Sequence, residues 1–207
     1  MNGCTAICIM DGMYDLGKPM KASSDGRILE IVIRRANAAD HLLLAEMGAE
    51  TFSDTFAADN TPENMAAYLT VSFGPDIQRR ELADPQSRFL IAEAGVSAVG
   101  YVRLKFGPAP TSIAGHKPVE IARFYSRTAW IGRGVGPRLM AACLMEAGRE
   151  GCDTIWLDVW ERNPRAIAFY GKWGFHTVGS QMFRLGDDLQ HDLLMARPVR
   201  MGRTTDG

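Results

Sequence analysis

The sequence predicts one mixed α/β (α+β) domain, built on a single, mostly antiparallel central sheet of about seven strands that helices flank. Three observations lead to this fold class. The 207 residues are 46% hydrophobic, which suits one complete core. Apolar residues alternate in some stretches and recur at helical spacing in others, in the order strand, three helices, three strands, helix, strand, helix, two strands. Glycine and proline clusters separate these stretches, and no segment repeats.

In the first half of the chain, helices are expected to precede the central strands. Helix-start signals open the first two of three helices: Asn37 with Asp40 three residues on, and Thr61 followed by Pro62. The third helix is short and ends before "DPQS". β-branched or alternating residues predict three strands, over 27–36, 88–94 and 96–106. The last two form an antiparallel hairpin, because Gly95 joins them.

In the second half, strands and helices alternate. Apolar runs predict four more strands, over 119–126, 153–160, 175–183 and 190–199. A helical apolar stripe lies over 135–147, and Asn163 with Pro164 begins a further helix that stops at Gly174. Residues 1–29 are rich in glycine and methionine and show no sustained period, so we interpret them as a disordered extension. The folded domain is then expected over 30–200, followed by a flexible tail over 201–207.

Composition and charge exclude several classes of function. Lysine and arginine number 23 against 24 acidic residues, so no bulk field favours nucleic acid or a membrane surface as partner. The four cysteines form neither a C-x-x-C pair nor a cluster at zinc spacing, which indicates reduced thiols in a cytoplasmic protein without a metal site. No segment approaches eighteen consecutive apolar residues, so no membrane span is expected.

The stretch "AWIGRGVGPRLM" is a glycine-rich turn that leads into a helix. It matches neither the phosphate loop G-x-x-x-x-G-K-[ST] nor the dinucleotide fingerprint G-x-G-x-x-G. A glycine turn at a helix start still offers open N–H groups and a positive dipole end to a pyrophosphate. The residues that would wrap such a group are Gly132, Arg133, Gly134, Val135, Gly136 and Pro137.

With this turn, "VEIARFYS" and "IWLDVWERNPRAIAFYGKWGFHTVG" resemble the GCN5-related N-acetyltransferase (GNAT) family, whose members transfer acetyl from acetyl-CoA to an amine. The family signature N-x-x-A-x-x-[FL]-Y-x-K-x-G-F is matched at Asn163, Ala166, Phe169, Tyr170, Lys172, Gly174 and Phe175. The sequence departs from the family at Ile131, where Gln or Arg is usual, so one side-chain contact to the pyrophosphate is expected to be missing. The resemblance implies the GNAT acyl-CoA N-acyltransferase fold, acetyl-CoA as cosubstrate and no metal.

The resemblance also implies where acetyl-CoA lies. The pantetheine arm would run beside the strand end formed by Phe124, Tyr125 and Ser126. The thioester would pass through a splay between this strand and the strand over 153–160. The turn from Ile131 to Pro137 would hold the pyrophosphate, and Asn163 and Phe169 would contact the cosubstrate from the next helix.

Tyr170 is implied as the general acid, since the leaving thiolate must gain a proton and a phenol has a higher pKa than a thiol. Without the motif, it would be a packing aromatic. The base, which takes a proton from the amine, is either Glu120 or Asp158, and we favour Glu120. Strand alternation predicts that Glu120 shares a face with Phe124.

The stretches "ETFSDTFAADNTPENMAAYL" and "GDDLQHDLLMA" are similar to bacterial polyamine N-acetyltransferases of the PaiA type, which implies spermidine or a related polyamine as acceptor. Candidate lining residues on the acceptor side are Phe52, Thr55, Phe56 and Tyr68, and candidate acidic groups are Glu50, Asp54, Asp59, Glu63 and Glu120. Two alternatives stay open: acetylation of a peptide or protein α-amine, and a CoA-binding sensor without turnover. The terminal stretch "DLLMARPV" could pair across a homodimer.

Overall fold

The computed structural model describes residues 29–185 and 188–199. The predicted extension over 1–29, apart from its last residue, and the predicted tail over 201–207 lie outside the described residues. Among the residues described, no helix has both the length and the apolar character needed to cross a membrane.

The centre of the molecule is a seven-stranded sheet in the order β1-β2-β3-β4-β5-β7-β6. Strands β4 and β5 are parallel, and the other neighbouring pairs are antiparallel, which confirms the predicted fold class. The strands are β1 (Ile31–Arg35), β2 (Ser87–Ala94), β3 (Ser97–Phe106), β4 (Pro118–Ser126), β5 (Thr154–Trp160), β6 (His176–Leu185) and β7 (Asp188–Pro198).

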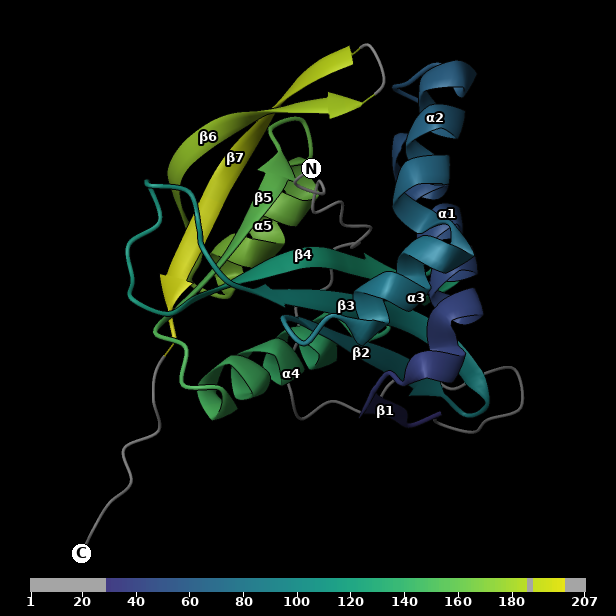
Figure 1. Cartoon of the computed structure of the whole chain (residues 1–207), viewed down its shortest axis with the longest axis horizontal. Helices are drawn as coiled ribbons and strands as arrows, with labels where there is room; N and C mark the ends of the chain where they lie inside the picture. The colour runs from purple at the N-terminus through teal and green to yellow at the C-terminus, as the bar shows by residue number, and fades with distance from the viewer. Residues whose placement is uncertain (1–28, 186–187, 200–207) are drawn as a thin grey trace, which may run out of the picture.

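Helices cover the two faces of this sheet (Figure 1). One face packs against the helices before the hairpin, and the other against the two later helices, so the core has two main apolar clusters. The first group is η1 (Ala38–Asp40), α1 (His41–Phe56), α2 (Pro62–Phe73) and α3 (Pro75–Ala83); η2 (Thr128–Trp130) then precedes the second group, α4 (Val135–Arg149) and α5 (Pro164–Lys172).

The helix starts follow the local signals in the sequence. The Asn37 side chain accepts from the Ala39 N–H, and Asp40 accepts from the Asn37 N–H at 2.7 Å, which forms a capping box. Thr61 caps α2, with Pro62 at its first position. The helix predicted from Asn37 therefore exists, but its first turn is the 3-10 helix η1.

Strand β4 contains a bulge that changes which side chains share a face. Arg123 pairs with Arg103 of β3, but the next pair toward the start of β4 skips Ala122, so Ala122 is an extra residue. The extra residue reverses the alternation, and Glu120 lies on the face of Arg123. Phe124 packs in the core on the opposite face. The prediction that Glu120 and Phe124 share a face is therefore wrong.

Strands β4 and β5 separate soon after they begin. Their pairing covers Pro118 with Thr154, Val119 with Ile155, and Glu120 with Trp156, and the remaining residues of each strand have no partner on the other. Figure 1 shows the two strands diverging from this point. The predicted splay is confirmed, and Glu120 stands at its narrow end.

Candidate active site

The glycine turn lies directly before α4. Gly132 and Gly134 have φ angles of 76° and 85°, and Gly134 is the N-cap of α4. A Cβ at Gly134 would meet no atom within 4 Å, so backbone conformation, and not lack of space, favours glycine there. The first N–H groups of α4, which have no carbonyl partner one turn earlier, therefore open onto this turn.

A strand glycine that the sequence analysis did not single out brings α4 close to the sheet. Gly100 of β3 pairs with Ser126, and a Cβ on it would lie 2.6 Å from the Tyr125 carbonyl oxygen and 2.9 Å from Val135. The first turn of α4 can therefore pack against the strand end that the resemblance assigns to pantetheine. A glycine within a strand is a signal for close backbone approach, and it could have indicated this position.

Residue 131, where the family usually has a polar side chain, is a half-buried isoleucine that follows η2. The next residues supply a cation instead: Arg133 is exposed, and its guanidinium lies 5.6 Å from the centre of the Trp130 ring.

Tyr170 lies on α5, on the same side of the sheet as Phe124. Its side chain is fully buried, and its ring packs against Phe124, Phe169 and Phe175 at centroid distances of 6.3, 5.6 and 5.4 Å. Asn163 caps α5, since its side-chain oxygen accepts from the Ala166 N–H at 3.1 Å. The structure therefore brings Tyr170 and Phe169 to the strand end at Phe124, as the resemblance implies.

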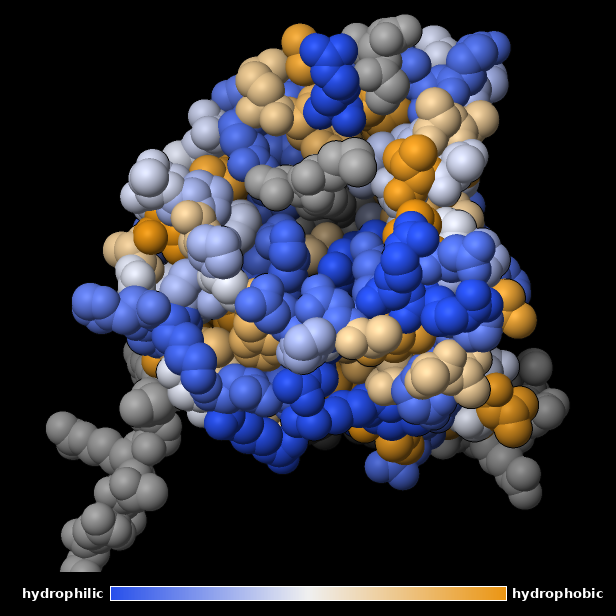
Figure 2. Space-filling model, in the orientation of Figure 1, coloured by the Kyte–Doolittle hydropathy of each residue, from blue (hydrophilic) through white to orange (hydrophobic). Residues whose placement is uncertain are grey.

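A cavity of about 950 Å³ lies on the other face, between α2, α3 and the strands β3, β4 and β6. Figure 2 shows hydrophilic and hydrophobic residues side by side around the middle of this view, with hydrophilic ones gathered in its lower half. Glu120 lines the cavity, although only 6% of its surface is exposed. Of the four residues predicted to line the acceptor side, Tyr68 lines this cavity. Phe52 and Phe56 are buried in the core, and Thr55 is not among the lining residues.

The acidic groups predicted for this side are mostly elsewhere. Glu50 lies 3.3 Å from Arg127, and Asp54 accepts a hydrogen bond from Thr128 at 2.6 Å, so both point to the segment after β4. Asp59 and Glu63 are exposed outside the cavity lining. Of these predicted acids, Glu120 lines the cavity.

The pKa of Glu120 is raised from its ordinary value of 4.5 to about 7. Burial is the largest cause, and the negative charge of Asp158 adds to it. Lys105, Arg103 and Arg123 oppose the shift. A carboxylate with this pKa can accept a proton at neutral pH and later return it to solvent.

Asp158 occupies a different environment from Glu120. Its side chain is fully buried on β5, and Gln181 donates a hydrogen bond to its Oδ2 at 2.9 Å. Gln181 itself lines the cavity. Both candidate bases thus lie on the cavity side of the splay, but Glu120 reaches the cavity and Asp158 is shielded by Gln181.

A buried ion-pair network, which sequence reasoning missed, anchors α3 beside this cavity. Glu81 accepts from Arg103 at 2.5 Å and from two nitrogens of Arg123 at 2.5 and 3.0 Å. Arg123 also donates to Gln78, and its guanidinium lies 4.9 Å from the Phe73 ring centre. These partners are far apart in the chain, so no local pattern indicates them.

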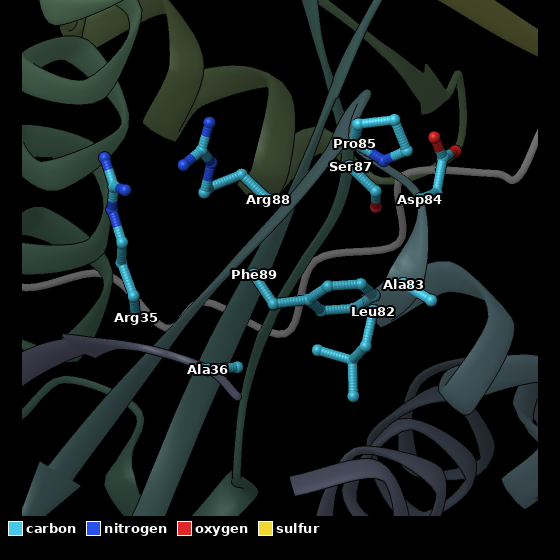
Figure 3. A pocket seen from close by; sticks show the side chains of 9 residues that line it. All are labelled: Arg35, Ala36, Leu82, Ala83, Asp84, Pro85, Ser87, Arg88 and Phe89. Carbon is cyan, nitrogen blue, oxygen red and sulfur yellow. The ribbon is translucent and has the colours of Figure 1, made fainter. Parts of the chain in front are cut away.

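A smaller cavity of about 340 Å³ lies beside the start of β2 (Figure 3). Arg35 and Arg88 line it, but their guanidinium groups pair with α4: Arg35 contacts Glu146 at 2.5 Å, and Arg88 contacts Glu150 at 2.9 Å. These contacts tie α4 to the sheet. None of the candidate catalytic or cosubstrate residues lines this cavity.

Comparison with known proteins agrees with this geometry. The model of the acetyltransferase (GNAT) family matches residues 49–175. An uncharacterised N-acetyltransferase of Lactobacillus delbrueckii subsp. lactis is 36% identical over 151 residues, which cover 72% of this chain and 87% of that protein. Both matches are to N-acetyltransferases, a class of enzymes that in this family uses acetyl-CoA. The chain belongs to the GNAT acetyltransferase family.

Two further relatives show the range of the similarity. The N-alpha-acetyltransferase RimI of Mycobacterium tuberculosis is 33% identical over 106 residues, which cover 51% of this chain and 62% of that protein. The crystal structure of the PaiA N-acetyltransferase from Thermoplasma acidophilum, in complex with coenzyme A, has a TM-score of 0.67 at 21% identity and covers 82% of this chain and 99% of that one. At this identity, the PaiA structure shows a shared fold.

Proposed function

We propose that this acetyltransferase moves acetyl directly from acetyl-CoA to a primary amine, with Glu120 as general base and Tyr170 as general acid. The observation that carries the proposal is the position of these two groups on opposite faces of the sheet at one splay. Glu120 and Trp156 form the last pair before β4 and β5 separate. Tyr170 packs against Phe124, which lies on β4 after this point.

The proposed reaction has balanced proton and bond changes. Glu120 takes a proton from the ammonium group, and the free amine nitrogen attacks the thioester carbonyl carbon. A C–N bond forms and the C–S bond breaks. As the intermediate collapses, the departing sulfur takes the proton of the Tyr170 hydroxyl, and the nitrogen loses its second proton to solvent. Glu120 then releases its proton to solvent and Tyr170 regains one from it, so that one proton is released overall. Asp158 contributes through its charge, which helps to keep the pKa of Glu120 near neutrality.

The cosubstrate contacts are part of the same proposal. The turn over Ile131, Gly132, Arg133, Gly134, Val135, Gly136 and Pro137 would hold the pyrophosphate at the α4 N-terminus through its N–H groups, to which Pro137 contributes none. The main chain of Phe124, Tyr125 and Ser126 would hydrogen-bond pantetheine where β4 has left β5. Asn163 and Phe169 would close the site from α5, and Arg133 would supply the charge that Ile131 does not.

Direct transfer fits the cysteines that the structure describes. Cys143 and Cys152 are fully buried free thiols. Burial raises the pKa of both thiols, which disfavours the thiolate that an acyl-cysteine intermediate needs.

Tyr170→Phe tests the mechanism. We expect kcat to fall by about 10²-fold or more, because the leaving sulfur loses its proton donor, with KM for acetyl-CoA nearly unchanged. Release of free CoA thiol measures both parameters. Phe124→Leu, which alters packing beside Tyr170 without removing a proton donor, serves as control. Unchanged turnover of Tyr170→Phe with unchanged acetyl-CoA binding would refute its role as acid.

Similarity to known acetyltransferases suggests two classes of acceptor. The PaiA resemblance favours a polyamine such as spermidine, and the RimI similarity favours the α-amine of a peptide or protein. A panel of spermidine, peptides and single amino acids, followed by CoA release, separates these two. Acetyl-CoA binding without thiol release on any amine would instead favour the sensor alternative.

A further inference from the structure

We propose that the acceptor amine carries carboxylates close to the amino group, as an acidic peptide or an acidic amino acid does. The inference rests on the proposed acetyl transfer and specifies its acceptor class. It departs from the polyamine prediction because it depends on the charges of the cavity beside Glu120.

The cavity lining is dominated by positive charge. Five of its side chains are cationic and two are carboxylates: Arg80, Arg103, Lys105, Arg123 and Arg184 against Glu81 and Glu120. Burial leaves Glu120 only partly ionised at neutral pH. A polyamine, with several ammonium groups, would therefore meet more like charge than opposite charge along this lining.

Not all of these cations are neutralised within the protein. Arg103 and Arg123 share the single carboxylate of Glu81, with side-chain exposures of 13% and 7%. Within residues 29–185 and 188–199, the side chains of Arg80, Lys105 and Arg184 form no hydrogen bond or ion pair. These three cations come from three elements, α3, β3 and β6, and can face a ligand, although the charge of Lys105 also acts on Glu120.

The charges are also ordered by depth. Glu120 and Asp158, with exposed fractions of 6% and 0%, lie at the buried end beside the splay. Arg80 and Arg184 are exposed, and half-buried Lys105 lies opposite Glu120 in the register between β3 and β4. An acceptor with an amine at one end and carboxylates behind it matches this order, because its amine meets Glu120 while its carboxylates stay near the three cations.

A peptide series tests the acceptor class. The probes are C-terminally amidated Ala-Glu-Glu, Ala-Gln-Gln and Ala-Lys-Lys, together with spermidine, L-glutamate and L-glutamine. We expect kcat/KM for the acidic peptide to exceed that for the neutral peptide by about tenfold at low salt, and the difference to shrink as salt is added. Higher kcat/KM for spermidine or the lysine peptide would overturn the inference. The glutamate and glutamine pair separates a free amino acid from a peptide as source.

Variants at the two exposed arginines identify the residues responsible. In Arg80→Gln/Arg184→Gln, kcat/KM for the acidic peptide should fall about tenfold, while that for the neutral peptide and KM for acetyl-CoA stay unchanged. Arg79→Gln is the matched control, since Arg79 lies on the same helix, is exposed and pairs with Asp76. An equal loss for acidic and neutral peptides, or an effect of Arg79→Gln as large as that of the double variant, would contradict the role of Arg80 and Arg184.

A binding measurement separates this inference from the proposed function. Isothermal titration of the CoA-loaded protein with the acidic and lysine peptides needs no turnover. If no amine is acetylated but the acidic peptide binds more tightly, the proposed reaction fails and the acceptor class stands. If turnover occurs and the lysine peptide binds more tightly, the reaction stands and the acceptor class fails.

Discussion

At the scale of single residues, Glu120 shows how backbone geometry determines chemistry. The bulge at Ala122 turns its carboxylate toward the cavity, and pairing with Trp156 holds it at the narrow end of the splay. Burial there raises its pKa to about 7, which an exposed strand glutamate would not show. The same burial carries a cost in stability, because the unfolded chain ionises this group more readily.

Glu120→Gln should therefore lose activity, and above about pH 4.5 it should become more stable than the wild type. The unfolded state releases the proton near pH 4.5 and the native state near 7, so Glu120 lowers the stability of the wild type as pH rises between these values. We expect the variant to be more stable than the wild type by about 3 kcal/mol at pH 8 and equal to it below pH 4. Its kcat/KM should fall by about 10²-fold or more.

Urea unfolding at several pH values and CoA release measure these two effects. Glu30→Gln, at an exposed residue before β1, is the control and should change neither. Between pH 4.5 and 8, the free energy of unfolding of the wild type should fall relative to that of Glu120→Gln. If it does not, the raised pKa of Glu120 is contradicted.

At the scale of elements, helix starts do much of the positioning. Gly134 begins α4 and Asn163 begins α5, and these two starts flank the region assigned to the cosubstrate. Thr61 begins α2, which borders the larger cavity, by the same kind of cap as Asn163, with its hydroxyl accepting from the Asn64 N–H at 3.3 Å. One type of local interaction therefore begins both helices, and at α5 the capping residue is also one that we propose to contact the cosubstrate.

Asn163→Ala and Thr61→Ala separate these two roles. Each variant loses an N-cap and should be destabilised by about 1 kcal/mol in urea unfolding. Only Asn163→Ala should also raise KM for acetyl-CoA, because the proposed contact lies at α5. An equal KM in both variants would remove Asn163 from the cosubstrate site and leave it as a cap.

At the scale of the whole molecule, one carboxylate joins three elements. Glu81 of α3 binds Arg103 of β3 and Arg123 of β4, which fixes one wall of the cavity to the sheet. Arg123 is almost fully buried, so it depends on this partner for compensation of its charge. Packing of the two apolar clusters supplies the rest of the attachment.

Glu81→Gln should destabilise the protein by about 3 kcal/mol, because two mostly buried guanidinium groups lose their counter-charge. Asp76→Asn is the matched control on the same helix: it breaks the exposed pair with Arg79 and should cost less than about 1 kcal/mol. Thermal and urea unfolding compare the two variants. Similar losses in both would mean that the Glu81 network does not anchor α3.

Local chemistry explains what could be predicted and what could not. Residues close together in the chain specify the strands, the glycine turn and the helix starts at Asn37, Thr61 and Asn163. The structure contains all of these features. The prediction that Glu120 shares a face with Phe124 was wrong because a bulge adds one residue to β4, and a bulge is recognised only from the pairing with the neighbouring strand. Acids predicted for the acceptor side, such as Glu50, pair elsewhere because helix periodicity does not say what a helix faces.

The sequence by itself determined the element order, the caps, the glycine turn and the GNAT family, because each depends on short-range spacing or on a motif. Only the tertiary structure decided which charges meet in the cavity beside Glu120. Arg80, Lys105 and Arg184 come from three elements and converge there only after the sheet has formed. Burial beside Asp158, which changes the pKa of Glu120, is likewise a property of the folded chain.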